Sequence, residues 1–154
     1  MTTEFDEVDR RILAALRNDA RVSNKALAAA AGIAQSTCLA RVQRLERSGV
    51  LIGYHAELAP KAIGIGVQAM ISVRLAKHAR SEVDAFVAHL LSLPEVLMLF
   101  HVAGVNDYLV HVAVRDTDHL RRLVLDAFTA RPEVAHLETN LIFDQVRNKK
   151  LPLF

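Results

Sequence analysis

The spacing of apolar residues changes at about Gly49, and this change restricts the chain to a fold with two different parts. Before Gly49 apolar residues recur three and four positions apart, as on one face of a helix, at Phe5, Val8, Ile12 and Leu16. After Gly49, apolar and alternating segments typical of strands are separated by helical patterns. The sequence therefore predicts an α+β protein, with a helical domain and an extended linker strand in residues 1–60 and a second domain in residues 61–154.

The first domain is expected to contain three helices joined by short turns. The second helix, NKALAAAA, follows Ser23, which is suited to cap it, and ends at Gly32. The third runs from Gln35 to about Arg47 and is closed by Gly49. A short helix, a tight glycine turn and a longer basic helix are typical of the helix-turn-helix motif that binds DNA.

Positive charge gathers on the third predicted helix. The whole chain is nearly balanced, with 19 basic and 17 acidic residues, whereas residues 20–49 contain five basic residues and one acid. Polar side chains at the start of such a helix suit base edges, and arginines suit guanine or phosphate, with Arg44 expected on a phosphate. The expected DNA-binding residues are Gln35, Ser36, Thr37, Arg41, Arg44 and Arg47. The alternative is a solvated basic helix face without a ligand.

The second domain is expected to be a ferredoxin-like βαββαβ unit. In chain order its segments are the strand VQAMISVRLA, the helix ARSEVDAFVAHLLSLP, the strands EVLMLFHVA and DYLVHVAVR, the helix DTDHLRRLVLDAFTAR and the strand EVAHLETNLIFDQV. Both helices of such a unit cover one face of the sheet. Because the second and third strands, VLMLFHVAG and YLVHVAV, are apolar at successive positions, the other face also needs burial. A second copy on that face would make an obligate homodimer.

Several strings resemble one protein family. VDRRIL, RVSN, CLARVQRLERSGVLIGY and VAGVNDYLV are similar to segments of the Lrp/AsnC (feast/famine) transcriptional regulators, and the resemblance runs from Phe5 to about Arg147. It implies a winged-helix-like domain that binds double-stranded DNA, followed by a βαββαβ effector domain called the RAM domain. It also implies dimers that assemble into larger rings, commonly octamers, and a small-molecule effector that is often an amino acid.

The hairpin turn of the second domain is the expected effector site. Gly104 permits close approach of a ligand, amides of the turn suit a carboxylate, and Asp107 suits an ammonium group. The resemblance supports this site at Gly104, Asp107 and Tyr108 and adds Thr139. The expected effector-binding residues are His101, Gly104, Val105, Asn106, Asp107, Tyr108 and Thr139. The alternative is an ordinary hairpin loop, because Gly, Asn and Asp are common in turns.

The sequence predicts no catalytic residues, no metal site and no cofactor. Cys38 lies alone on the apolar stripe of its helix, which favours a core residue over a nucleophile. His101 and His111 are expected to face each other across the hairpin, but two imidazoles are fewer ligands than zinc requires. With one cysteine, no signal-peptide pattern and no apolar run of about 18 residues, the protein is expected in the cytoplasm without a membrane partner.

The sequence therefore predicts a sequence-specific DNA-binding transcriptional regulator that responds to an amino acid or a related small molecule. Two other functions remain open. One is an enzyme on the same architecture, because siroheme decarboxylases resemble these regulators. The other is a stand-alone amino-acid sensor without DNA binding. The end of the chain, RNKKLPLF, is either a flexible end or a strap across a partner.

Overall fold

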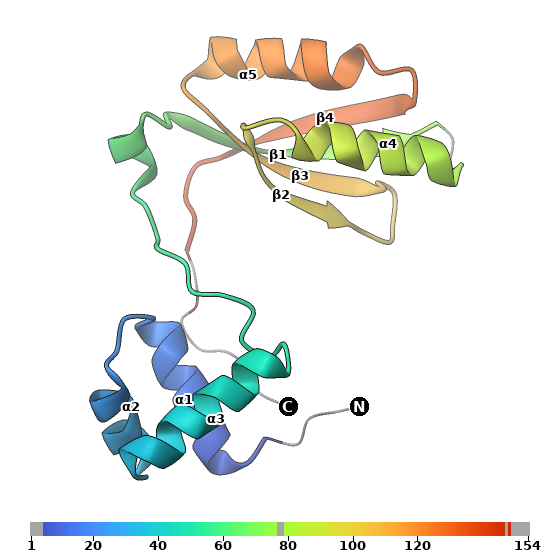
Figure 1. Cartoon of the computed structure of the whole chain (residues 1–154). Coiled ribbons are helices and arrows are strands. Elements are labelled where there is room, and N and C mark those ends of the chain that lie inside the picture. Colours follow the sequence, from blue (N-terminus) through green and yellow to red (C-terminus); the bar gives the residue numbers. More distant parts are fainter. Residues whose placement is uncertain (1–4, 77–78, 147, 149–154) are drawn as a thin grey trace. The chain divides into compact units, whose positions relative to one another are not determined.

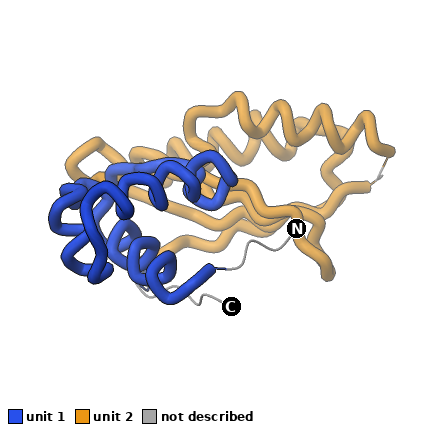
Figure 2. Tube along the Cα trace, turned by 60° about the horizontal axis from the view of Figure 1, so that its bottom comes forward, with its two compact units in different colours: residues 1–57, 146–154 blue, residues 58–145 orange. Residues whose placement is uncertain are grey.

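The structure is a computed structural model that describes residues 5–76, 79–146 and 148. These residues form two compact units (Figure 2). The helical unit contains residues 5–57 together with Val146 and Asn148, and the sheet unit lies within residues 58–145. The expected second domain, residues 61–154, instead includes these two C-terminal residues. In the helical unit the Asn148 carbonyl accepts a hydrogen bond from Arg17 at 3.2 Å. The rest of RNKKLPLF lies outside the described residues.

The helical unit contains the three predicted helices (Figure 1). They are α1 (Glu7–Asn18), α2 (Asn24–Ala31) and α3 (Gln35–Arg47). Asp6 caps α1 by accepting a hydrogen bond from the Asp9 amide, and Ser23 caps α2 through the Ala26 amide. Gly32 adopts a left-handed conformation, with φ of 72°, that ends α2 and turns the chain into α3. Local sequence signals therefore determine where these helices begin and end.

A small apolar core joins the three helices. Its buried members are Ile12, Leu16, Leu27, Ala28, Ala31, Cys38 and Leu45. Cys38 lies in this core, as its position on the apolar stripe predicts, and burial raises the pKa of its thiol. Because one stripe of α3 packs into this core, the opposite side of α3 faces away from it.

Residues 50–59 are all described and form neither helix nor strand. The Tyr54 hydroxyl donates a hydrogen bond to Glu46 at 2.9 Å, whereas Ile52 and Leu58 are largely exposed. A 3₁₀ helix, η1 (Pro60–Ile63), follows this segment. The extended linker strand expected here is thus an extended chain without a strand partner among the described residues.

The sheet unit has the predicted βαββαβ order. Its elements are β1 (Val67–Leu75), α4 (Arg80–Leu91), β2 (Val96–His101), β3 (Tyr108–Val114), α5 (Thr117–Leu123), η2 (Val124–Thr129) and β4 (Val134–Ile142). The helical turns of η2 are wider, of π type, and continue α5 directly. The four strands are antiparallel in the order β2-β3-β1-β4, which is the ferredoxin-like arrangement.

Both helices of this unit lie on the same face of the sheet (Figure 1). Buried residues of α4, α5 and η2, among them Phe86, Leu120 and Phe128, pack there against the sheet. No described element of this unit covers the opposite face. The residues of β1, β2 and β3 that lie on that face at paired strand positions are Met70, Ser72, Met98, Phe100, Leu109 and His111. His111 lies 2.8 Å from the Gln68 side-chain oxygen, and burial lowers its pKa.

The strand register contradicts one expectation about the hairpin. His101 lies opposite Tyr108, and His111 lies opposite Met98, so the two histidines do not face each other. The prediction was wrong because it centred the turn on Asn106, whereas the register centres it between Gly104 and Val105. Strand pairing closes at His101 and Tyr108, and residues 102–107 form the connection.

Candidate functional site

The turn between α2 and α3 fixes the start of the longer helix. The Asn24 side chain donates a hydrogen bond to the Gln35 carbonyl at 2.9 Å, which ties the first turns of α2 and α3 together. Ala34 stands at the N-cap of α3 and supplies no side-chain cap. The polar residues that open α3 are exposed: Gln35, Ser36 and Thr37. The structure thus groups the polar members of the expected DNA-binding set at one end of α3.

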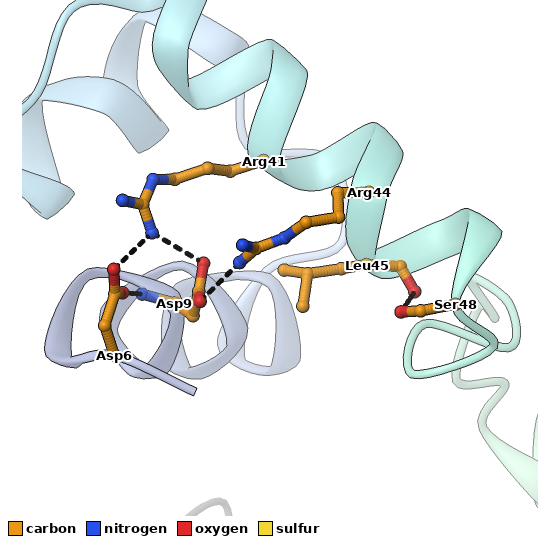
Figure 3. A network of polar contacts seen from close by, with 6 residues as sticks. All are labelled: Asp6, Asp9, Arg41, Arg44, Leu45 and Ser48. Atoms are coloured by element: carbon orange, nitrogen blue, oxygen red, sulfur yellow. Dashed lines mark hydrogen bonds and ion pairs between the residues drawn. The ribbon is translucent and has the colours of Figure 1, made fainter. Parts of the chain in front are cut away.

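Two arginines of the same set are held by carboxylates of the α1 region (Figure 3). One guanidinium nitrogen of Arg41 lies 2.7 Å from Asp6 Oδ2 and 3.0 Å from Asp9 Oδ1. Arg44 donates to Asp9 Oδ2 at 2.5 Å. The two oxygens of Asp9 therefore bind two different arginines of α3.

Asp9 is the buried member of this network. It is 1% exposed, whereas the Arg41 and Arg44 side chains are 26% and 49% exposed. A buried carboxylate requires charged hydrogen-bond partners, because removing it from water is otherwise costly. The hydrogen bond from the Asp9 amide and then the one from Arg41 lower the pKa of Asp6, and the hydrogen bonds that Arg41 donates to Asp6 and Asp9 raise the pKa of Arg41.

The network changes the interpretation of the basic helix. Asp6 and Asp9 lie outside residues 20–49, whose charges were counted above, but they lie directly against Arg41 and Arg44, which form the arginine stripe of α3. Arg47 is exposed and makes no ion pair with any residue the structure describes. The positive charge that α3 presents to solvent is therefore smaller than the residue count predicts, and it shifts toward the C-terminal end of the helix.

A stripe of α3 that is not part of the expected DNA-binding set as a whole points directly away from the core. We call it the outward stripe; its residues are Ser36, Ala40, Gln43 and Arg47. All four are exposed, and exposed Leu39 flanks them. Each residue of a helix turns by about 100°, so this stripe lies opposite the apolar stripe that contains Cys38. The sequence contains this signal, because the apolar stripe is recognisable without a structure.

The hairpin turn brings together all the expected effector-binding residues except Thr139. Gly104 has a φ of 145°, a conformation that favours glycine. The rings of His101 and Tyr108 stack with their centroids 4.8 Å apart. Tyr108 is buried beside Phe86 of α4, whereas Val105 is largely exposed. The turn therefore has a buried aromatic base and an exposed tip.

Asp107 also has a structural role. Its Oδ2 accepts a hydrogen bond from the Leu75 amide at 2.7 Å, and its own amide donates to the Val73 carbonyl at 2.9 Å. These contacts tie the turn to the end of β1. An experiment on a ligand role of Asp107 must therefore preserve the acceptor for Leu75.

Thr139 lies apart from the turn within one chain. Thr139 lies on β4, opposite Ile71 of β1, and β1 separates β4 from the hairpin. Neighbouring strands are about 4.8 Å apart, so β3 and β4 are separated by about 10 Å. The structure does not bring Thr139 beside the other expected effector residues of its own chain.

The described residues contain no group of three or more His, Cys, Asp or Glu side chains suited to hold a metal ion. His119 and Glu95, 3.1 Å apart, form a pair only. Within the described part of the chain, no helix is both long and apolar enough to span a membrane.

Comparison with known families decides what kind of protein this is. Residues 5–46 match the AsnC-type helix-turn-helix domain, and residues 68–152 match the Lrp/AsnC ligand binding domain. This chain belongs to the Lrp/AsnC family. The regulator combines a DNA-binding domain with a domain for a small-molecule effector, and it is a DNA-binding transcriptional regulator, as the sequence predicts.

The chain is similar to named transcriptional regulators over nearly its whole length. The chain is 46% identical to the HTH-type transcriptional regulator AldR of Mycolicibacterium smegmatis, covering 94% of this chain and 84% of that one. It is 33% identical to the leucine-responsive regulatory protein of Rhizobium meliloti, covering 94% and 93%. The crystal structure of a Neisseria meningitidis transcriptional regulator in complex with L-Met matches with a TM-score of 0.90 at 29% identity, covering 97% of each chain.

The role of Asp9 in stability can be tested with Asp9→Asn. This change keeps the size of the side chain but removes the charge that binds two arginines, so it is expected to lower the free energy of unfolding by about 1.5–3 kcal/mol. Urea unfolding followed by circular dichroism measures the difference. Asp6→Asn is the control, because asparagine caps helices equally well and Asp6 is exposed. Equal stability of the Asp9→Asn and wild-type proteins would contradict this role.

Proposed function

We propose that the regulator binds a specific double-stranded DNA site by placing α3 in the major groove. The exposed start of α3 supports this, because the first residues of such a helix meet base edges. The proposed DNA-binding residues are Gln35, Ser36, Thr37, Arg41, Arg44 and Arg47. Among the arginines, Arg47 is the best placed for phosphate, because it is exposed and no described carboxylate pairs with it.

The proposed effector is an amino acid or a related zwitterion bound beside residues 104–108. Amides of the turn would bind the carboxylate, Asp107 the ammonium group, and His101 would line the site. A leucine-responsive relative and a structural neighbour in complex with L-Met support this class of ligand. Thr139 would take part from a neighbouring subunit, because β1 separates it from the turn of its own chain.

The proposed assembly is a homodimer that builds a larger ring, an octamer in the form that the family resemblance implies. The uncovered face of the sheet supports the dimer, since Met98 and Phe100 are exposed there beside half-buried Leu109. Large apolar faces in water favour association, and a second copy would cover this face symmetrically. If the effector binds where dimers meet, it would shift the equilibrium between free dimers and the larger ring. The size of this shift is set by the difference between its affinities for these two forms.

We also propose that the regulator is not an enzyme. Its named relatives are regulators, whereas a siroheme-decarboxylase-like activity would require tetrapyrrole binding. Absorbance titration with a tetrapyrrole distinguishes the two functions, because binding shifts the tetrapyrrole spectrum. A stand-alone sensor would have no salt-dependent affinity for DNA.

Arginine substitutions test the docking of α3. Arg47→Ala is expected to weaken binding to all DNA sequences and to reduce the slope of log K against log salt concentration by about 0.9, the value for one phosphate contact. Arg44→Ala makes the same charge change but is expected to reduce the slope less, because Arg44 is bound to Asp9. Fluorescence anisotropy with a labelled duplex measures both. Unchanged affinity and slope in both variants would contradict the docking.

Asp107→Asn tests the effector site. The amide retains an acceptor for the Leu75 amide but loses the charge for an ammonium group, so the affinity for the amino acid is expected to fall about ten-fold or more. Calorimetry with the common amino acids provides the measurement. Asp126→Asn, the same change at an exposed position of η2, is the control. A ligand that binds the wild-type and Asp107→Asn proteins equally would remove Asp107 from the site, and one bound within the helical unit would overturn the site altogether.

Phe100→Glu tests the dimer. A charge on the uncovered sheet face is expected to give monomers at micromolar concentration, where wild type sediments as a dimer or larger species. Leu91→Glu is the control, because Leu91 is an exposed apolar residue of α4, on the other side of the sheet. A wild-type protein that sediments as a stable monomer would exclude the dimer.

A further inference from the structure

The outward stripe of α3 contains an amide side chain with no role in the fold. Gln43 is exposed, and it makes no side-chain hydrogen bond with the part of the chain that the structure describes. It lies between Ala40 and Arg47 on that stripe, with Leu39 next to it. Glutamine can bind the two major-groove groups of adenine at once, and small apolar side chains contact the methyl group of thymine. Gln43 and its apolar neighbours together suit an A·T base pair.

Two arginines of α3, Arg41 and Arg44, are less suited to read bases. To reach guanine, Arg41 would have to give up contacts of 2.7 Å and 3.0 Å to Asp6 and Asp9. Arg44 would have to leave Asp9, whose carboxylate is buried. Leaving a buried carboxylate without its partners is strongly unfavourable. Asp6 and Asp9, which we call the acid pair, therefore keep these arginines on the side of α3 that faces α1.

We propose that Gln43 is a specificity-determining residue that reads adenine in an A·T pair, and that Asp6 and Asp9 are positioning residues that keep Arg41 and Arg44 from guanine. This proposal rests on the docking of α3 in the major groove. It assigns base reading to Gln43 on the outward stripe instead of to Arg41 and Arg44.

The helix geometry fixes where the A·T pair lies. A helix rises about 1.5 Å per residue, so Gln43 is about 10 Å along α3 from Ser36. Base pairs are about 3.4 Å apart along the duplex. A helix aligned with the groove therefore places the pair read by Gln43 about three base pairs from the pair that Ser36 contacts.

Selection from a random-sequence duplex library tests this proposal on the full-length protein. The wild-type motif is expected to contain a required A·T pair in each half-site. Gln43→Ala is expected to lose that preference, by a factor between about 5 and about 150, and to keep the other positions. Gln43→Glu is expected to replace adenine by cytosine there, because a carboxylate accepts from the cytosine amino group. Arg47→Ala is the matched control, expected to weaken binding while leaving the motif unchanged.

The acid pair is tested with Asp6→Asn, which retains the α1 cap and removes one of the two negative charges that bind Arg41. We expect tighter binding to non-specific DNA and a steeper salt slope, because Arg41 gains freedom to reach phosphate. Thermal unfolding confirms that each variant is folded. An unchanged salt slope would overturn the role of the acid pair.

The outcomes separate this inference from the proposed function. A wild-type protein that enriches no motif would contradict the docking of α3, and this inference with it. A wild-type motif that Gln43→Ala leaves intact would overturn the inference alone. So would a required G·C pair that disappears in Arg44→Ala, because the arginine stripe would then be the reading surface.

Discussion

The DNA-binding half of this regulator depends on the ion pairs that the buried carboxylate of Asp9 makes with α3. This carboxylate accepts hydrogen bonds from Arg41 and Arg44, and the adjacent cap residue Asp6 binds Arg41 as well. Apolar contacts between helices allow some rotation and sliding, whereas hydrogen-bonded ion pairs require particular positions of both partners. The network therefore fixes which side of α3 faces α1, and with it which side is available to a ligand.

A carboxylate has a comparable position in the sheet unit. Asp107 accepts a hydrogen bond from the Leu75 amide and so joins the hairpin turn to β1. In both units a carboxylate maintains local geometry, and in the sheet unit the same carboxylate is the proposed contact for the ligand. An alanine substitution at Asp107 would mix these two effects. Asparagine separates them, because it keeps the shape and a hydrogen-bond acceptor while removing the charge.

Much of the fold could be predicted because its signals are local. Ser23 and Gly32 mark the ends of α2, and the alternate apolar positions Ala69, Ile71, Val73 and Leu75 of β1 are buried. The order of helical and strand patterns then leaves few topologies, and βαββαβ with both helices on one face is the observed one. The candidate sites were predicted in the same way, from a basic helix and a hairpin turn that are each continuous in sequence.

The sequence by itself determined the order of the helices and paired strands, the ends of α2 and the two candidate regions, since caps, turns and apolar periods act over a few residues. Only the tertiary structure decided which long-range pairs form. It paired Arg41 and Arg44 with acids of the α1 region, set His101 opposite Tyr108, and separated Thr139 from the hairpin by β1. These contacts depend on how whole elements pack and on strand register, and a residue count or a local spacing carries no information about either.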